Sequence, residues 1–154
     1  MANVVDIKIE KVLLLKLMKE LSKKSFINLG VFSNSRSDGK DNLEIAARHE
    51  LGIGVPRRSF LLFPLLFRKS AILEFMNNSE KHIKFIITKG LDAWLGQVMI
   101  SCMSIINNGF SSGGYGQWKV LSPLTIRKKK NAVILIDTGD MLKSITSIVV
   151  RKSN

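Results

Sequence analysis

The feature that most constrains the fold is a long helical pattern in the middle of the chain, from Leu61 to Asn107. Apolar residues recur there at a period near 3.6, which is typical of helices that bury one face. The pattern falls into three pieces: 61–76, 80–88 and 91–106. Pro64 suits the start of the first piece, and Ser79 can cap the second. Gly90 either ends the second helix or kinks one that continues.

Outside this region the sequence predicts two short strands and further helices. Phe26–Phe32 and Ile145–Arg151 are rich in β-branched and aromatic residues. Ile7–Leu21 has a helical rhythm with a wide apolar face, and Leu43–Leu51 is a short helix that Asp41 or Asn42 can cap and Gly52 can end. We therefore expect a single α+β domain, residues 1–154, in which a small antiparallel sheet packs against about four helices.

Two polar or glycine-rich stretches are predicted to be flexible loops, Ser33–Lys40 and Asn108–Gly116. The second contains three glycines within four residues, as phosphate-binding loops do. It lacks both a preceding strand and the Gly-Lys-Thr/Ser ending of such loops. A mobile arm is the simpler interpretation.

The charge balance is the strongest bulk signal: 24 Lys and Arg against 12 Asp and Glu, a net charge of +12. Such an excess favours a polyanionic neighbour, most often nucleic acid. The basic residues are spread along the chain without the interleaved aromatic residues that stack on bases. The largest basic group is the run Arg127, Lys128, Lys129 and Lys130, and a smaller one is Arg57 with Arg58.

The region from Trp118 to Ile145 is the most densely patterned. Pro123 suits the first turn of a short helix that leads into the basic run. Val133–Ile136 is predicted to be a buried apolar run. Asp137 or Thr138 is expected to cap a helix that ends near Ser144, since short oxygen-bearing side chains favour that position.

No convincing catalytic or metal-binding constellation emerges. His49-Glu50 lacks the second histidine of a zinc helix, and His82 has no partner at a suitable spacing. The Asp137-Thr138-Gly139 triplet resembles that of aspartic proteases, which requires a second carboxylate lobe or a dimer axis. Asp137 and Asp140, with Glu44 or Glu50, could be drawn as a Mg²⁺-dependent nuclease, although capping and surface charge explain them more simply.

We therefore expect no enzyme activity and no cofactor or metal. The lone Cys102 excludes an internal disulfide and indicates a reducing compartment. The start of the chain does not have the pattern of a signal peptide, and the 91–106 window is too short and polar for a membrane span, so no membrane partner is expected.

Two segments together resemble a known family. Ile45–Gly52 (IAARHELG) with Val55–Leu61 (VPRRSFL) is similar to a signature of tailed-phage morphogenesis proteins. Trp118, Leu121–Thr125 (LSPLT) and Leu135–Ile145 (LIDTGDMLKSI) resemble their C-terminal motif. The motif residues singled out by this resemblance are His49, Glu50, Gly52, Pro56, Phe60, Trp118, Pro123, Asp137, Thr138 and Gly139.

The resemblance implies a structural virion protein of the neck, head-tail completion or minor tail type. Such a subunit assembles with copies of itself into a ring, a hexamer being one candidate, through which genomic DNA passes. Adjacent connector or stopper and tail terminator proteins would be its other partners. It would be assembled in the host bacterial cytoplasm and reside in the virion. A free nucleic-acid-binding module is the main alternative, and a metal-dependent nuclease the weaker one.

Within that interpretation the motif residues shape the subunit. Pro56 would hold a connector extended so that Phe60 enters the core, while Arg57 and Arg58 stay at the surface, either as solvated charges or as contacts to a partner. Thr138 and Gly139 would form the turn into the last helix. The run Arg127 to Lys130 is a solvated charge run or faces the DNA lumen or a neighbouring subunit.

Overall fold

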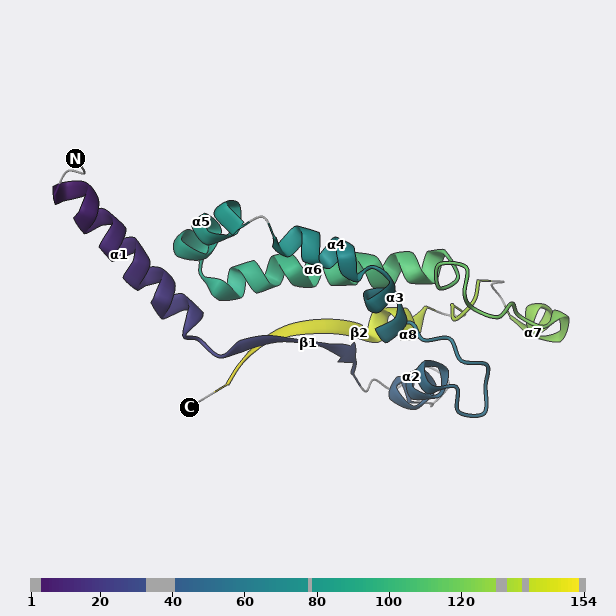
Figure 1. Ribbon diagram of the computed structural model, residues 1–154. Helices are drawn as coiled ribbons and strands as arrows, with labels where there is room; N and C mark the ends of the chain where they lie inside the picture. Colours follow the sequence, from purple (N-terminus) through teal and green to yellow (C-terminus); the bar gives the residue numbers. More distant parts are fainter. Residues whose placement is uncertain (1–3, 33–40, 78, 130–132, 137–138, 153–154) are drawn as a thin grey trace.

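The computed structural model describes residues 4–32, 41–77, 79–129, 133–136 and 139–152, with side chains from Glu10 onward. The molecule is elongated, with α1 projecting at one end and α7 at the other (Figure 1). Within the described residues the elements are α1 Val4–Leu21, β1 Ser25–Val31, α2 Asn42–Leu51, α3 Leu62–Phe67, α4 Lys69–Met76, α5 Ser79–Lys89, α6 Leu91–Ser111, α7 Pro123–Lys128, α8 Asp140–Ser144 and β2 Ile145–Arg151.

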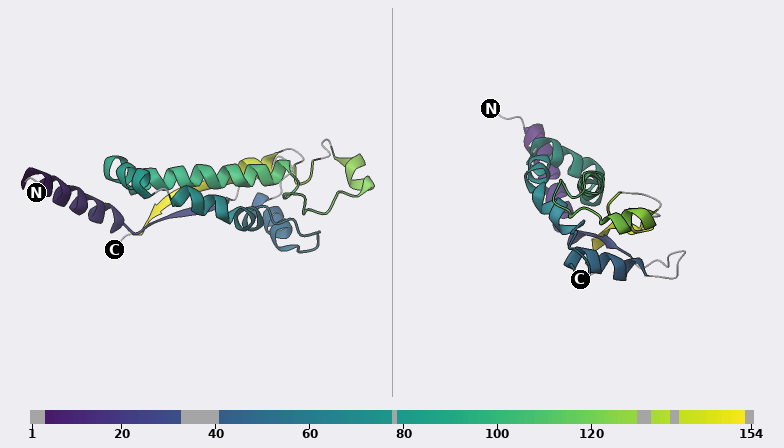
Figure 2. Two further views of the ribbon diagram at one scale, coloured as in Figure 1. Left: turned by 45° about the horizontal axis from the view of Figure 1, so that its top comes forward. Right: turned by 90° about the vertical axis from the view of Figure 1, so that its right-hand side faces the viewer.

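The two predicted strands pair with each other, so the expected α+β class is confirmed. β1 and β2 run antiparallel, with Ser25 opposite Arg151 at one end and Val31 opposite Ile145 at the other. The long helix α6 contacts both strands and runs along the sheet, as the left view in Figure 2 shows. Because two strands alone are marginally stable in water, this helix supplies the apolar surface that the sheet needs.

The helical body contains more helices than the sequence indicated. The single helix expected over 61–76 is two helices, α3 and α4, separated at Arg68, whose φ of −103° and ψ of 20° lie outside the helical region. No glycine or proline marks that break. Gly90 does end the next helix: its φ of 93° separates α5 from α6, so the alternative of one kinked helix is wrong.

The predicted cap of α2 and the predicted position of Pro123 in the first turn of α7 are confirmed. The Asp41 side chain accepts a hydrogen bond from the Leu43 amide at 2.9 Å at the start of α2, and Gly52 ends that helix with a φ of 79°. At the start of α7 the Ser122 hydroxyl accepts from the Thr125 amide, with Pro123 as the first helical residue.

The predicted flexible loop at Asn108–Gly116 is wrong. α6 continues to Ser111, and Phe110 is 1% exposed in the core. The following turn is tied by backbone hydrogen bonds, from the Gly114 amide to the Gly109 carbonyl at 2.7 Å and from the Trp118 amide to the Gly113 carbonyl at 3.0 Å. These glycines allow close packing and positive φ angles, so their number does not indicate flexibility. The other predicted loop, Ser33–Lys40, lies outside the described residues.

The apolar run after the basic residues is less buried than predicted. Val133 is 40% exposed, and Ile134, Leu135 and Ile136 are half-buried against the core. The cap of α8 also differs, since Gly139, with a φ of 82°, occupies the N-cap position expected for Asp137 or Thr138. Those two residues lie outside the described part of the chain. The end of α8 at Ser144 and the bounds of β2 are as predicted.

The core gathers residues from distant parts of the sequence. Its buried members are Ala46, Phe60, Ile106, Phe110, Trp118, Met141 and Ile145. Side chains from α2, α6, α8 and β2 therefore meet the two loop residues Phe60 and Trp118. None of the helices over the described residues is long and apolar enough to cross a bilayer.

Candidate functional site

The Glu50 carboxylate, at the end of α2, lies at the centre of a dense group of hydrogen bonds. It accepts from the Ser59 hydroxyl at 2.6 Å and from the backbone amides of Phe60, Leu61 and Leu62 at 2.8 to 3.0 Å. The Leu62 amide lies in the first turn of α3, where backbone donors have no partner within the helix, and Phe60 and Leu61 directly precede it. Glu50 therefore caps α3 from a neighbouring helix. The Glu50 side chain is half-buried there.

Arg58 lies beneath the surface, which corrects the prediction that it is exposed. It is 6% exposed, and its Nε and Nη2 donate to the Lys119 carbonyl at 3.2 and 3.0 Å. Its backbone amide donates to the His49 carbonyl at 2.8 Å. Burial lowers the pKa of the guanidinium, because it disfavours the charged form. Arg58 thus joins the end of α2 to the segment after Trp118.

Trp118 completes the same group from the other motif. Its indole Nε1 donates to the Ser59 carbonyl at 3.2 Å, and its ring meets that of Phe110 edge-on, with centroids 5.6 Å apart. Phe110 in turn packs against Phe60 at 5.4 Å. We call Glu50, Arg58, Ser59, Phe60 and Trp118 the Glu50 cluster.

Two glycines permit this packing. A Cβ on Gly114 would lie 2.3 Å from the Trp118 ring, and Gly114 has a φ of 69°. A Cβ on Gly52 would lie 2.9 Å from Cβ of Arg57. Pro56, in the extended connector between these elements, is itself exposed, so it acts on the backbone path and not by filling the core.

His49 borders the Glu50 cluster with its ring half-buried. Its Nδ1 is buried and has no hydrogen-bond partner among the described residues. Burial is the main cause that lowers its pKa, and the positive charges of Arg58 and Lys129 lower it further. The imidazole is therefore neutral at pH 7. Among the described residues His49 belongs to no group of side chains that could hold a metal ion.

The basic residues predicted to face DNA or a neighbouring subunit differ in exposure and in their contacts. Arg127 and Lys128 are exposed on α7 at one end of the molecule (Figure 1). Lys129 bends back, and its Nζ donates to the carbonyls of Val133 and Ile136, both at 2.8 Å. Arg57 is exposed, with its Nε donating to the Glu50 carbonyl. Lys130 lies outside the described residues, so Arg57, Arg127 and Lys128 are the basic candidates that the structure places at the surface.

Within the described residues no group of three His, Cys, Asp or Glu side chains could hold a metal ion. Glu44 pairs with Arg48 at 2.9 Å on the surface of α2, and both oxygens of Glu50 accept hydrogen bonds from the chain. Of the two aspartates in that cluster, Asp140 lies in the first turn of α8, and Asp137 lies outside the described residues. Glu44 is thus engaged in an ion pair, and Glu50 as a hydrogen-bond acceptor for the backbone.

Sequence reasoning missed two polar or aromatic groups. His82 packs between Phe75 and Trp94, with centroids 5.1 and 5.7 Å away, and its Nε2 bonds to the Phe75 carbonyl. The Glu20 carboxylate of α1 accepts a hydrogen bond from the Leu91 amide at the start of α6. Helical periodicity identified each element, but no local pattern indicates which helices pack together.

Comparisons of the chain with protein-family models, with curated proteins and with solved structures find no match. The resemblance to phage morphogenesis proteins therefore rests on the motif residues alone.

Proposed function

We propose that this protein is a structural subunit of a tailed-phage or prophage virion, of the neck or tail-completion type. Copies of the chain assemble into a ring at the head-tail junction, between connector or stopper and tail terminator proteins, and genomic DNA passes through the ring. Assembly takes place in the bacterial cytoplasm, and the mature location is the virion.

The observation that carries the proposal is the Glu50 cluster. The two segments that resemble the family are about 60 residues apart in sequence, yet Glu50, Ser59 and Phe60 from the first meet Trp118 from the second. Every polar contact in the cluster holds one part of the chain to another. A shared architectural constraint explains why both motifs occur in one chain, whereas a catalytic role would leave reactive groups open to a substrate.

The elongated shape is a second support. A protruding apolar helix at one end is costly for a subunit that remains alone in water, because large exposed apolar patches mark interaction surfaces. Val12, Leu14, Leu15 and Met18 of α1 are between 56% and 63% exposed. Such a subunit gains stability by assembling.

The test is the mass and shape of the purified protein. Native mass spectrometry and negative-stain electron microscopy are expected to find a closed ring with a central opening, and the same chain is expected in purified particles by peptide mass spectrometry. A protein that stays monomeric over the whole accessible concentration range and never enters particles would overturn the proposal.

Nucleic-acid binding without a virion role is the second candidate, favoured by the net charge of +12 and by the exposed Arg127 and Lys128 on α7. Tight duplex binding near physiological salt by a protein that forms no ring would support this alternative.

A further inference from the structure

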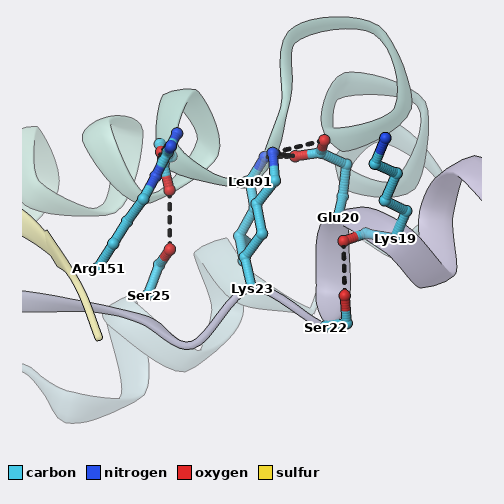
Figure 3. A network of polar contacts seen from close by, with 8 residues as sticks. Lys19, Glu20, Ser22, Lys23, Ser25, Leu91 and Arg151 are labelled. Atoms are coloured by element: carbon cyan, nitrogen blue, oxygen red, sulfur yellow. Dashed lines mark hydrogen bonds and ion pairs between the residues drawn. The ribbon is translucent and has the colours of Figure 1, made fainter. Parts of the chain in front are cut away.

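Hydrogen bonds join the C-terminal end of the helix α1 to the body of the protein. Glu20 accepts from the Leu91 amide at 2.9 Å and from the Lys23 ammonium at 2.6 Å, so it caps α6 from outside (Figure 3). These hydrogen bonds lower the pKa of Glu20, with that from Lys23 the largest cause. Beside them, Asp92 accepts from Ser25 and Arg151 and ties the sheet to α6. The joint sets the direction of α1 relative to the body.

Beyond this joint α1 exposes large apolar side chains on more than one side, with charged residues such as Lys11 and Lys16 between them. Leu14, Met18 and Leu21, at spacings of four and three residues, form one stripe, and they are 57%, 60% and 56% exposed. Val12 and Leu15 extend the apolar surface to the neighbouring sides. Large apolar side chains that are exposed together are typical of an interaction surface. Among the described residues α1 packs against α5, and its Glu20 bonds to the start of α6.

The same chain also has a shallow groove that is lined by uncharged side chains. Two adjacent hollows, of about 370 and 430 Å³, share Ile100 and Ser104 of α6. One extends towards Ile72 and Phe75 of α4, and the other towards Met103 of α6. Ile100 is 66% exposed between them. We call this surface the α6 groove.

We infer that α1 of one copy docks into the α6 groove of the next copy, head to tail. The inference rests on the proposed ring function, for which it names the contact between neighbours. A helix that presents anchors at i, i+4 and i+7 to an apolar groove is a common recognition mode. Because the helix and the groove are different surfaces of one chain, the contact is heterologous and can close into a ring.

The distribution of charge favours a second copy of the chain over nucleic acid or a membrane surface as the partner. The chain carries a net charge of +12, so the basic surfaces of two copies repel each other. Among the described residues no charged side chain lines either hollow, so a second copy meets no repulsion there. Nucleic acid requires a basic groove, which this is not. A membrane-surface helix separates its lysines from its apolar face, whereas Lys11 lies three and four residues before Leu14 and Leu15, on their side of α1.

Substitution in the full-length protein tests both sides of the contact. Met18→Glu and Ile100→Glu each change an exposed side chain, so folding by circular dichroism should be unchanged. Burying such a side chain contributes enough that either variant should raise the concentration needed for assembly on the order of 10- to 100-fold in sedimentation velocity. Val120→Glu, at a residue that is 78% exposed near α7, is the matched control and should assemble normally.

Cysteine cross-linking tests the geometry. In a Cys102→Ser background, Met18→Cys protein is mixed with Ile100→Cys protein and oxidised. Head-to-tail docking predicts disulfide dimers in the mixture and none in either variant alone. Dimers of Met18→Cys with itself would overturn the head-to-tail contact.

Further outcomes separate this inference from the ring function. If a ring forms and both glutamate variants leave it intact, the inference is wrong and the proposed function stands. If the wild-type protein is monomeric and does not cross-link, both are wrong. Vesicles of anionic phospholipid test a membrane surface as the partner of α1. If the wild-type monomer binds these vesicles and Met18→Glu abolishes that binding, the partner of α1 is a membrane surface and the inferred contact between copies is wrong.

Discussion

At the scale of the residue, Glu50 has the largest number of described hydrogen-bond donors around a single side chain in the motif region. We predict that Glu50→Ala lowers the free energy of unfolding by about 2 to 4 kcal/mol, since amides at the start of α3 lose a charged acceptor. Glu44→Ala, which breaks only a surface ion pair with Arg48, should change it by less than about 0.5 kcal/mol. Urea denaturation of both variants measures the difference, and equal effects would contradict this role for Glu50.

Gly114 is a second residue at which local geometry decides stability. Gly114→Ala should cost about 3 kcal/mol, because it combines a positive φ with a Cβ that overlaps the Trp118 ring. Gly116 is the matched control: it has a φ of 78° but open space around a Cβ, so Gly116→Ala should cost only about 1 kcal/mol. Thermal unfolding of the pair isolates the Trp118 contact. A similar loss in both would mean that strain of the backbone alone is responsible.

His49 makes stability depend on pH. Its pKa in the folded protein is below the ordinary value of 6.5, so near and below pH 6.5 the unfolded chain binds more protons than the folded one. The stabilisation is present above pH 6.5 and is lost progressively as the pH falls towards the folded pKa. We expect the free energy of unfolding to decrease from pH 7 to pH 5.5 in wild type and to change less in His49→Gln. Identical slopes would exclude His49 as the cause.

At the scale of the element, α7 carries the exposed part of the basic run. If it faces DNA, Arg127→Ala with Lys128→Ala should weaken duplex binding and reduce the slope of log affinity against log salt by about 2, since each lost phosphate contact contributes about 0.9. Lys81→Ala with Lys89→Ala, on the exposed side of α5, is a charge-matched control. Fluorescence anisotropy in a salt series gives both slopes. Equal slopes in the two variants would show that α7 has no particular contact with DNA.

Elements with local signals were predicted well from the sequence. The cap at Asp41, the stop at Gly52, Pro123 in α7 and the strand Ile145–Arg151 all depend on chemistry within a few residues of the chain. The break at Arg68 and the ordered turn at Gly114 were missed. Arg68 carries no breaking residue, and the glycines after α6 serve the close approach of Trp118, which no local pattern indicates.

At the scale of the whole molecule, the net charge of +12 opposes assembly, while the proposed contact between copies is apolar. Raising the salt from about 0.1 M to about 1 M shortens the screening length from about 10 Å to about 3 Å and weakens that repulsion. We therefore expect ring assembly to strengthen with salt and DNA binding to weaken. Sedimentation velocity and anisotropy measure the two trends. Dissociation of the ring at high salt would instead indicate that ionic contacts hold the interface together.

The sequence by itself determined the α+β class, the pairing candidates of the sheet and the two motif segments, because these follow from periodicity and from residues adjacent in the chain. Only the tertiary structure decided that Glu50 caps α3, that Arg58 is buried and that Trp118 joins the first motif. It also decided that α1 projects from the body with its apolar residues exposed. The physical reason is that burial and hydrogen-bond partners depend on which distant segments meet in space.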